Sequence, residues 1–248
     1  MSQNNIRQRQ TQEMTNPLQR SGSFVKNPHP ENLTDKQKKA ILLSLPAGES
    51  MYFYADTLST GWNQEQATAY LQENLKVKNS ELARASIDFS FQEGERTIYN
   101  ILLPHLLVNK ELPDLLDCLK KRYLSVALLQ VYAENLHKGL HLLHSHSTFQ
   151  LNRSDLVEGI FAWDIIRIIL LTRLSWDAGF FTQEEALNHA EKAVDCCKSR
   201  FKSWESIVKS FLIGEAMRNG ANSHFATTLE ITTKVLTEKE SPWKETTW

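Results

Sequence analysis

Residues 155–217 read DLVEGIFAWDIIRIILLTRLSWDAGFFTQEEALNHAEKAVDCCKSRFKSWESIVKSFLIGEAM, and this stretch decides the fold. Its first part, from Ile160 to Leu174, is apolar at most positions. A helix that is apolar nearly all round is buried on most sides, so this segment is predicted to be the central helix. Its apolar residues are Ile160, Phe161, Trp163, Ile165, Ile166, Ile168, Ile169, Leu170, Leu171 and Leu174.

Two charged residues, Asp164 and Arg167, interrupt the apolar run near its start. They are three positions apart, so they share one helix face and can pair with each other or with a neighbouring element. A buried charge needs such a partner, because an unpaired one costs on the order of several kcal/mol. Two interpretations stay open. The pair is either a buried ion pair that fixes the helix beside Trp163, which is the commoner case, or an acid and a guanidinium that line a cleft for an anionic group.

The same stretch carries clear signals for where helices begin and end. Gly179 stands in a favoured position after the end of the first helix. Thr182 and Glu185 form a capping box, in which the Thr hydroxyl accepts from the Glu amide and the Glu side chain reaches back. Ser203 caps a third helix, and Gly220 lies just past its end. The stretch is therefore predicted to hold three helices.

Four motifs follow one another here: AWDIIR, WDAGFFTQEEA, FKSWES and FLIGEAM. Through them, residues 155–217 resemble a bacterial family of uncharacterised proteins, domain-of-unknown-function family 1266, typified by YbeU and YbeR. One departure is Glu215, which stands where the family usually has Arg. The resemblance implies a fold and a set of residues, but no activity. The matching residues are Trp163, Asp164, Arg167, Ala178, Gly179, Glu184, Glu185, Ala186, Ser203, Trp204, Glu205 and Gly214.

The rest of the chain divides into three predicted regions. Residues 1–33 are rich in Gln, Asn, Arg and Ser, which predicts a disordered polar tail. Residues 34–220 are predicted to form a helical domain, and residues 221–248 a C-terminal helix with a frayed end. No segment shows the sustained alternation of a strand. The predicted fold is therefore all-α, with about nine or ten helices around one main core.

Within the helical domain, the positions of prolines and of a glycine predict where two helices begin, kink or end. Pro104 is predicted to kink or end the helix that contains it. From Pro113, which suits a first helical position, the pattern stays helical to about His146, with a kink expected at Gly139.

Composition excludes several classes of function. The 248 residues carry 28 basic and 29 acidic side chains, for a net charge of -1. This balance gives no electrostatic reason to expect binding to nucleic acid or to an anionic membrane. The longest apolar run is too short for a membrane span. The three cysteines, Cys118, Cys196 and Cys197, form no CxxC pair, and the N-terminus carries no apolar leader. We therefore expect free thiols and a cytoplasmic location.

A group of histidines raises the question of a metal site. His137, His141 and His144 are spaced by four and three, so they share one helix face. With Glu134, His137 forms one half of a di-iron carboxylate pattern. The second half is missing, and a half-buried, His-rich helix end is the commoner explanation. No metal and no other cofactor is therefore predicted.

Ser203 and Trp204 are the last candidates. They fit a helix cap with an aromatic anchor, whereas a nucleophilic Ser needs a base and an oxyanion hole, and no Gly-x-Ser-x-Gly motif is present. The candidate polar cluster, functional or structural, consists of Trp163, Asp164, Arg167, Ser203 and Trp204.

The absence of a catalytic motif and the many helices favour a protein that binds another protein. One alternative is an enzyme with a polar site around Asp164 and Arg167. Another is a secreted effector or the immunity partner of one. The oligomeric state stays open.

Overall fold

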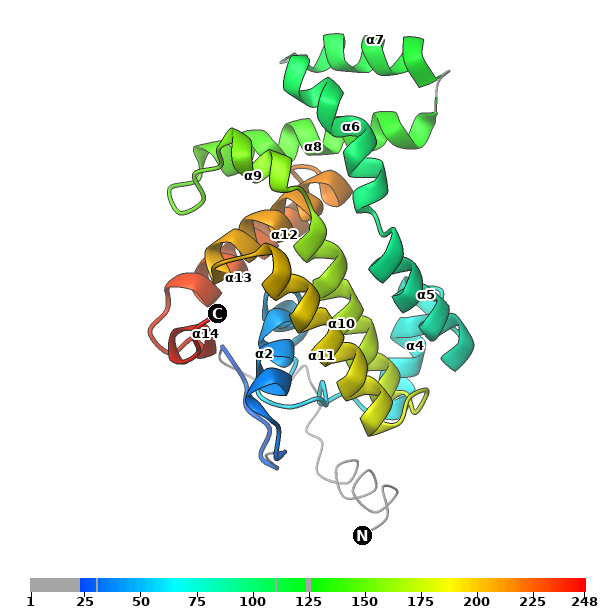
Figure 1. The fold of residues 1–248 in the computed structure, drawn as a ribbon, viewed down its shortest axis with the longest axis vertical. Coiled ribbons are helices and arrows are strands. Elements are labelled where there is room, and N and C mark those ends of the chain that lie inside the picture. Colours follow the sequence, from blue (N-terminus) through cyan, green and yellow to red (C-terminus); the bar gives the residue numbers. More distant parts are fainter. Residues whose placement is uncertain (1–22, 30, 110, 124–125) are drawn as a thin grey trace. The chain divides into compact units, whose positions relative to one another are not determined.

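The computed structural model describes residues 23–29, 31–109, 111–123 and 126–248. Within these ranges every regular element is a helix, which confirms the predicted all-α class (Figure 1). Eleven of the helices have six residues or more. Where the sequence suggested one main core, the contacts divide the chain into two compact units. Unit 1 holds the chain up to Phe89, Ile166–Arg200 and Lys234–Trp248, and unit 2 holds Ser90–Ile165 and Phe201–Thr233.

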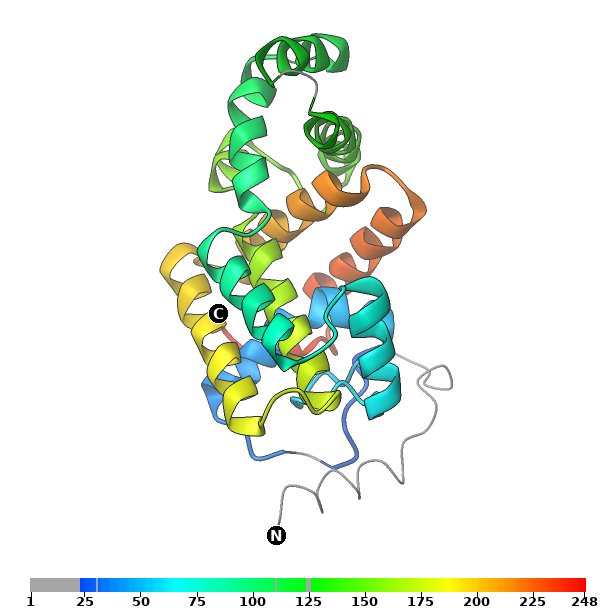
Figure 2. The same ribbon diagram turned by 90° about the vertical axis from the view of Figure 1, so that its right-hand side faces the viewer.

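Unit 2 is built on the packing of α8 against α12 (Figure 2). Gly139 of α8 permits this packing, because a Cβ atom there would lie 2.5 Å from the Cβ atom of Ala216 on α12. The glycine therefore serves a close helix contact. The helices of unit 2 are α6 (Arg96–Val108), α7 (Leu112–Tyr123), α8 (Ala127–Ser145), α9 (Arg153–Glu158), α12 (Trp204–Asn219) and most of α13 (Ser223–Thr237).

Two expectations about unit 2 change. The helix predicted from Pro113 to His146 is two helices, because α7 ends at Tyr123 and α8 begins at Ala127. Of the two outcomes expected at Pro104, an end of the helix is excluded, because α6 continues to Val108.

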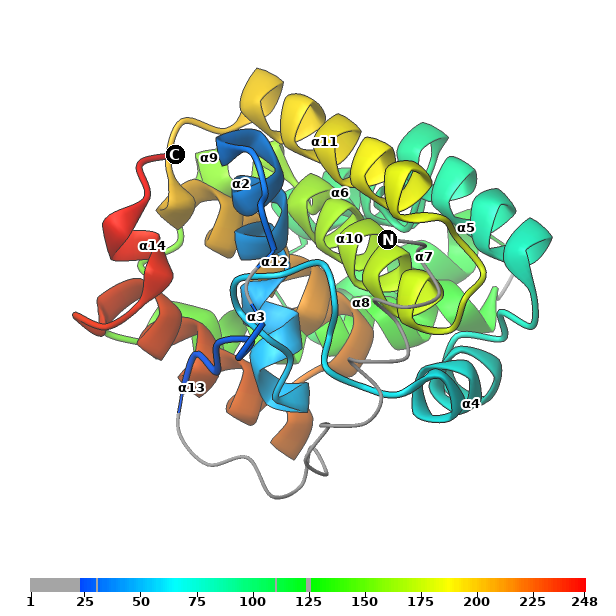
Figure 3. The ribbon, with the colours of Figure 1, turned by 90° about the horizontal axis from the view of Figure 1, so that it is seen from below.

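Unit 1 is built around the second part of α10, with α11 packed along α2 (Figure 3). Capping boxes at Thr34 and Asn63 begin α2 and α4. The helices of unit 1 are α2 (Asp35–Leu43), α3 (Leu45–Gly48), α4 (Gln64–Asn74), α11 (Gln183–Arg200), α14 (Pro242–Glu245) and the larger parts of α5 (Ser80–Gln92) and α10 (Phe161–Asp177); a 3-10 turn spans Glu49–Met51.

The long helix α10 contributes to both units, since the boundary falls between Ile165 and Ile166. From Phe161 to Trp176 its residues are buried, except for the half-buried Arg167. This burial confirms the central helix predicted from the apolar run. None of the helices in the described ranges has the length and apolar character needed to cross a membrane.

Both ends of the described chain are packed. The predicted disordered tail falls mainly on residues 1–22, which lie outside the described residues. Ordered structure begins before the predicted boundary, since Phe24 is buried and its N–H donates to Glu49 Oε1 at 2.9 Å. The C-terminal end, expected to be frayed, is held by Trp243. Its ring is buried, and its Nε1–H donates to the carbonyl oxygen of Leu42 at 2.9 Å.

Candidate functional site

Asp164, the main candidate from the sequence, lies in the part of α10 that belongs to unit 2, and only 2% of its surface is exposed. Its carboxylate accepts from the backbone N–H groups of Glu95 at 2.9 Å and Arg96 at 3.3 Å. It also forms an ion pair with Arg96 Nη1 at 2.8 Å. The charged partner thus comes from a neighbouring helix, α6. Arg167 lies on the part of α10 that belongs to unit 1.

The turn that precedes α6 packs closely against the Asp164 carboxylate. Gly94 has a φ of 64°, and a Cβ atom at this position would lie 2.3 Å from Asp164 Oδ2. Arg96 also donates to the carbonyl oxygens of Ser90 at 2.7 Å and Phe91 at 2.8 Å. Burial raises the pKa of Asp164, and the hydrogen bond from Arg96 opposes this rise. Because these contacts engage both side chains in closing the turn, they favour a structural ion pair.

Trp163 is also engaged within unit 2. It is 1% exposed, and its Nε1–H donates to Glu215 Oε1 at 2.7 Å. The other oxygen of Glu215 accepts from Asn219 Nδ2 at 2.8 Å and lies 3.6 Å from His224 Nε2. Glu215 is therefore the acceptor for the buried indole. Gly214 makes room for this indole, since a Cβ atom there would lie 2.4 Å from the Trp163 ring.

Ser203 and Trp204 act at the start of α12. The Ser203 hydroxyl accepts from the N–H of Ser206 at 3.2 Å in a capping box, as the sequence predicts for a cap. Trp204 is 9% exposed and contributes to the core. Among the five candidates, Trp163, Asp164, Ser203 and Trp204 belong to unit 2 and Arg167 belongs to unit 1.

The candidate histidines lie on α8. His137 is half-buried, while His141 and His144 are exposed. In the described ranges no three His, Cys, Asp or Glu side chains are grouped so that they could hold a metal ion.

Unit 1 contains a buried arginine that sequence reasoning did not single out. Arg173, on α10, is 1% exposed. Its guanidinium donates to Ser44 Oγ at 2.9 Å. It also donates to four backbone carbonyl oxygens between α3 and α4, those of Tyr54, Thr57, Leu58 and Ser59, at 2.6 to 3.1 Å. A non-helical segment can be buried only if its carbonyl groups find donors, and Arg173 supplies them.

Asp177 completes this arrangement one helical turn further along α10. Its carboxylate accepts from the Thr60 N–H at 2.8 Å and from the Ser59 hydroxyl at 3.1 Å. Burial raises the pKa of Asp177 to about 7 and lowers the pKa of Arg173 to about 10. The sequence signal that could have indicated this arrangement is the spacing of four between Arg173 and Asp177, two charged residues at the end of an apolar helix.

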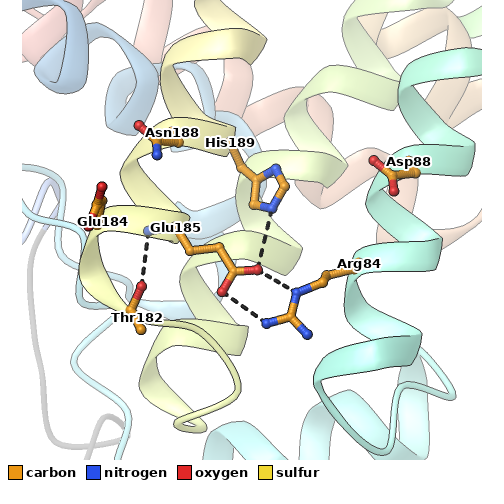
Figure 4. A pocket seen from close by; sticks show the side chains of 7 residues that line it. All are labelled: Arg84, Asp88, Thr182, Glu184, Glu185, Asn188 and His189. Carbon is orange, nitrogen blue, oxygen red and sulfur yellow. Dashed lines mark hydrogen bonds and ion pairs between the residues drawn. The ribbon is translucent and has the colours of Figure 1, made fainter.

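A polar cleft lies on the surface of unit 1, between α5 and the start of α11 (Figure 4). At its centre Arg84 and Glu185 form a bidentate ion pair, with Nε–Oε1 at 2.6 Å and Nη2–Oε2 at 3.0 Å. His189 Nε2 lies 4.0 Å from Glu185 Oε1. The cleft has a volume of about 450 Å³ and is lined by Arg84, Asp88, Thr182, Glu184, Glu185, Asn188 and His189.

The sequence predicted only some of the contacts in this cleft. Thr182 Oγ1 accepts from the Glu185 N–H at 3.2 Å, which confirms one half of the predicted capping box. The Glu185 carboxylate binds Arg84, and the Arg84 hydrogen bond lowers the pKa of Glu185. Burial lowers the pKa of His189, so its ring is neutral at neutral pH. The lining therefore carries three carboxylates against one guanidinium.

Comparison with known proteins gives one match. The model of a family described as "Protein of unknown function (DUF1266)" matches residues 70–248, which contain both helices of the cleft. This range extends well beyond residues 155–217, on which the resemblance in the sequence rested. No curated protein and no solved structure matches the chain.

Proposed function

We propose that this chain, which belongs to the DUF1266 family of proteins of unknown function, acts by binding another protein through α5 and the adjoining cleft of unit 1. The observation that carries the proposal is an exposed apolar stripe on α5 beside a cleft with excess negative charge. We refer to Leu82, Ala85, Phe89 and the cleft together as the α5 face.

The apolar stripe follows from the helical period. Leu82, Ala85 and Phe89 are spaced by three and four, so they lie along one side of α5. Leu82 is 41% exposed and Phe89 is 53% exposed. Ala83 and Ile87, on the opposite side of the helix, are buried in the core. Large apolar side chains aligned in this way are a recurrent feature of surfaces that bind proteins.

The cleft adds a preference for charge. Arg84 neutralises Glu185, so Asp88 and Glu184, both exposed, supply the excess negative charge. A partner segment with apolar side chains for the stripe and a Lys or Arg for the cleft would complement both. Arg84, Glu185 and His189 give the cleft a defined shape, while the charge of Asp88 and Glu184 would select the partner.

The contacts around Asp164 support binding over the alternative of an enzyme centred on this residue. Asp164 forms hydrogen bonds with Arg96 and with two backbone N–H groups. Arg96 in turn donates to two carbonyl oxygens. An effector or an immunity partner would also act by binding, and toxicity on expression would identify an effector.

The test compares captured partners by quantitative mass spectrometry, with the full chain as bait in an extract of the native cell. We expect a stoichiometric protein that is retained by the wild type and lost with the double variant Leu82→Glu and Phe89→Glu. Val157→Glu is the matched control, because Val157 is 60% exposed on α9, outside the α5 face. Asp88→Lys should weaken binding and reduce its dependence on salt.

Two results would contradict the proposal. One is a partner retained equally by the double variant and by Val157→Glu, which would place the interface elsewhere. The other is a wild-type protein that captures nothing in stoichiometric amount.

A further inference from the structure

Three side chains of unit 2 form a hydrogen-bonded row between α6 and α7. Cys118 Sγ lies 3.4 Å from His105 Nδ1, and His105 Nε2 lies 3.2 Å from the Tyr123 hydroxyl. The rings of His105 and Tyr123 also meet edge to face, with centroids 5.6 Å apart. A thiol, a base and a group that orients the base, each within hydrogen-bonding distance of the next, are the parts of an activated cysteine.

The contacts define how protons are shared along this row. When the thiol donates to His105 Nδ1, the ring carries its proton on Nε2 and donates it to the Tyr123 oxygen. Burial lowers the pKa of His105, and the nearby charge of Arg122 lowers it further. The ring is therefore neutral at neutral pH, and its unprotonated Nδ1 can accept the hydrogen bond from the thiol.

Cys118 also faces a place where a second molecule can bind. It lines an open pocket of about 620 Å³ together with Val108, Asn109, Glu111, Asp114, Asp117 and Lys121. Lys121 pairs with Asp117 at 2.6 Å, so Glu111 and Asp114 supply the excess negative charge of the lining. A positively charged molecule would be drawn to this pocket, and an anion would be repelled.

The geometry points to Cys118 as a nucleophilic thiol that His105 deprotonates, with positively charged electrophiles held by Glu111 and Asp114 as its substrates. In the reaction, the proton moves from Sγ to His105 Nδ1 while sulfur forms a bond to the electrophilic atom. The bond from that atom to its leaving group breaks, and the leaving group departs with the electron pair. Tyr123 is a positioning residue that keeps Nδ1 of His105 directed at the thiol.

The test uses two methanethiosulfonate reagents of opposite charge on the folded full chain. One carries a trimethylammonium-ethyl group and the other a sulfonato-ethyl group. The Cys118 thiolate attacks the sulfenyl sulfur, a mixed disulfide forms, and methanesulfinate leaves, so the chemistry balances without another oxidant. Peptide mass spectrometry gives the rate at each cysteine. Cys196 on α11 is the matched control, because it is half-buried like Cys118.

The rate of modification of Cys118 by each reagent is divided by the rate of the same reagent with a free thiol. We expect this normalised rate to be about tenfold higher for the cationic reagent than for the anionic one. Cys196 should show no comparable preference. The double variant Glu111→Gln and Asp114→Asn should abolish the preference at Cys118. Equal rates for the two reagents at Cys118 would overturn the assignment of the substrate charge.

The role of the base is tested separately. His105→Asn should slow modification of Cys118 by about tenfold or more, with Cys196 unaffected. Tyr123→Phe keeps the ring contact and removes the hydroxyl, so it should slow Cys118 with an unchanged melting temperature and should alter the pH profile of the rate. If both variants react at the wild-type rate, or if Cys118 reacts no faster than Cys196, Cys118 is an ordinary packed thiol.

Discussion

Arg173 and Asp177 lie one turn apart on α10 and bind opposite chemical groups of the same segment. The guanidinium donates to carbonyl oxygens of residues 54–59, and the carboxylate accepts from the N–H of Thr60. The segment between α3 and α4 is therefore buried without a helix or a sheet to satisfy its backbone. Two side chains from a helix far away in the sequence supply much of its backbone hydrogen bonding, and Glu31 Oε2 accepts a further bond from the Leu58 N–H at 2.9 Å.

Replacing Arg173 should be among the most damaging single changes in unit 1. Arg173→Met keeps the length of the side chain but leaves four carbonyl groups without their donor and removes a positive charge that favours the ionised form of Asp177. We expect the free energy of unfolding to fall by about 3–5 kcal/mol, measured by urea denaturation. Arg84→Met, which removes an exposed ion pair, should have little effect. Equal losses in the two variants would contradict this role for Arg173.

The raised pKa of Asp177 predicts a distinct dependence on pH. Because the pKa is about 7 in the folded chain and 3.8 ordinarily, the folded state binds more protons between these values. The contribution of Asp177 to stability therefore falls as pH rises through this window. Asp177→Asn cannot titrate. The melting temperature of the wild type minus that of the variant should thus decrease from about pH 5 to about pH 8.

Other groups that titrate in this range, such as His189, are present in both proteins and cancel in that difference. A difference in melting temperature that is independent of pH would show that Asp177 is ionised throughout.

Gly139→Ala should separate α8 from α12. A methyl group at this position would meet the Cα and Cβ atoms of Ala216 at 2.9 and 2.5 Å, so the helices must move apart. We expect a loss of about 1–3 kcal/mol in urea denaturation. Lys138→Ala, one position earlier and exposed, is the control and should change stability little. A stabilised Gly139→Ala protein would indicate that helix propensity outweighs the contact.

Asp164→Asn distinguishes a structural residue from a site. It removes the charge that pairs with Arg96, so the free energy of unfolding should fall on the order of 3 kcal/mol. Capture of the partner through the α5 face should be unchanged when measured well below the melting temperature of the variant. Loss of capture with unchanged stability would instead assign Asp164 to a binding or catalytic site.

Local signals in the sequence predicted much of the fold. The burial of α10 followed from an apolar run that leaves no polar face, and the cap at Ser203 depends on residues within three positions of each other. Such features can be recognised because the atoms that interact are close in the chain.

Long-range pairs could not be predicted in this way. Asp164 was expected to pair with Arg167 or with an unspecified neighbour, and its partner Arg96 lies 68 positions away. Glu185 was expected to reach back to Thr182, yet its carboxylate binds Arg84, 101 positions away. A bidentate guanidinium is a stronger partner than one amide, but only the fold brings it within reach.

The division into two units has a consequence for how the polypeptide is made. Five successive segments alternate between the units, so the chain passes from one unit to the other four times. Trp243 completes unit 1 by packing beside α2, whose apolar residues leave the ribosome some two hundred positions earlier. During synthesis, neither unit can finish folding before its last segment leaves the ribosome. The apolar faces of the N-terminal helices therefore stay exposed until then. The protein is therefore expected to depend on chaperones more than its size suggests.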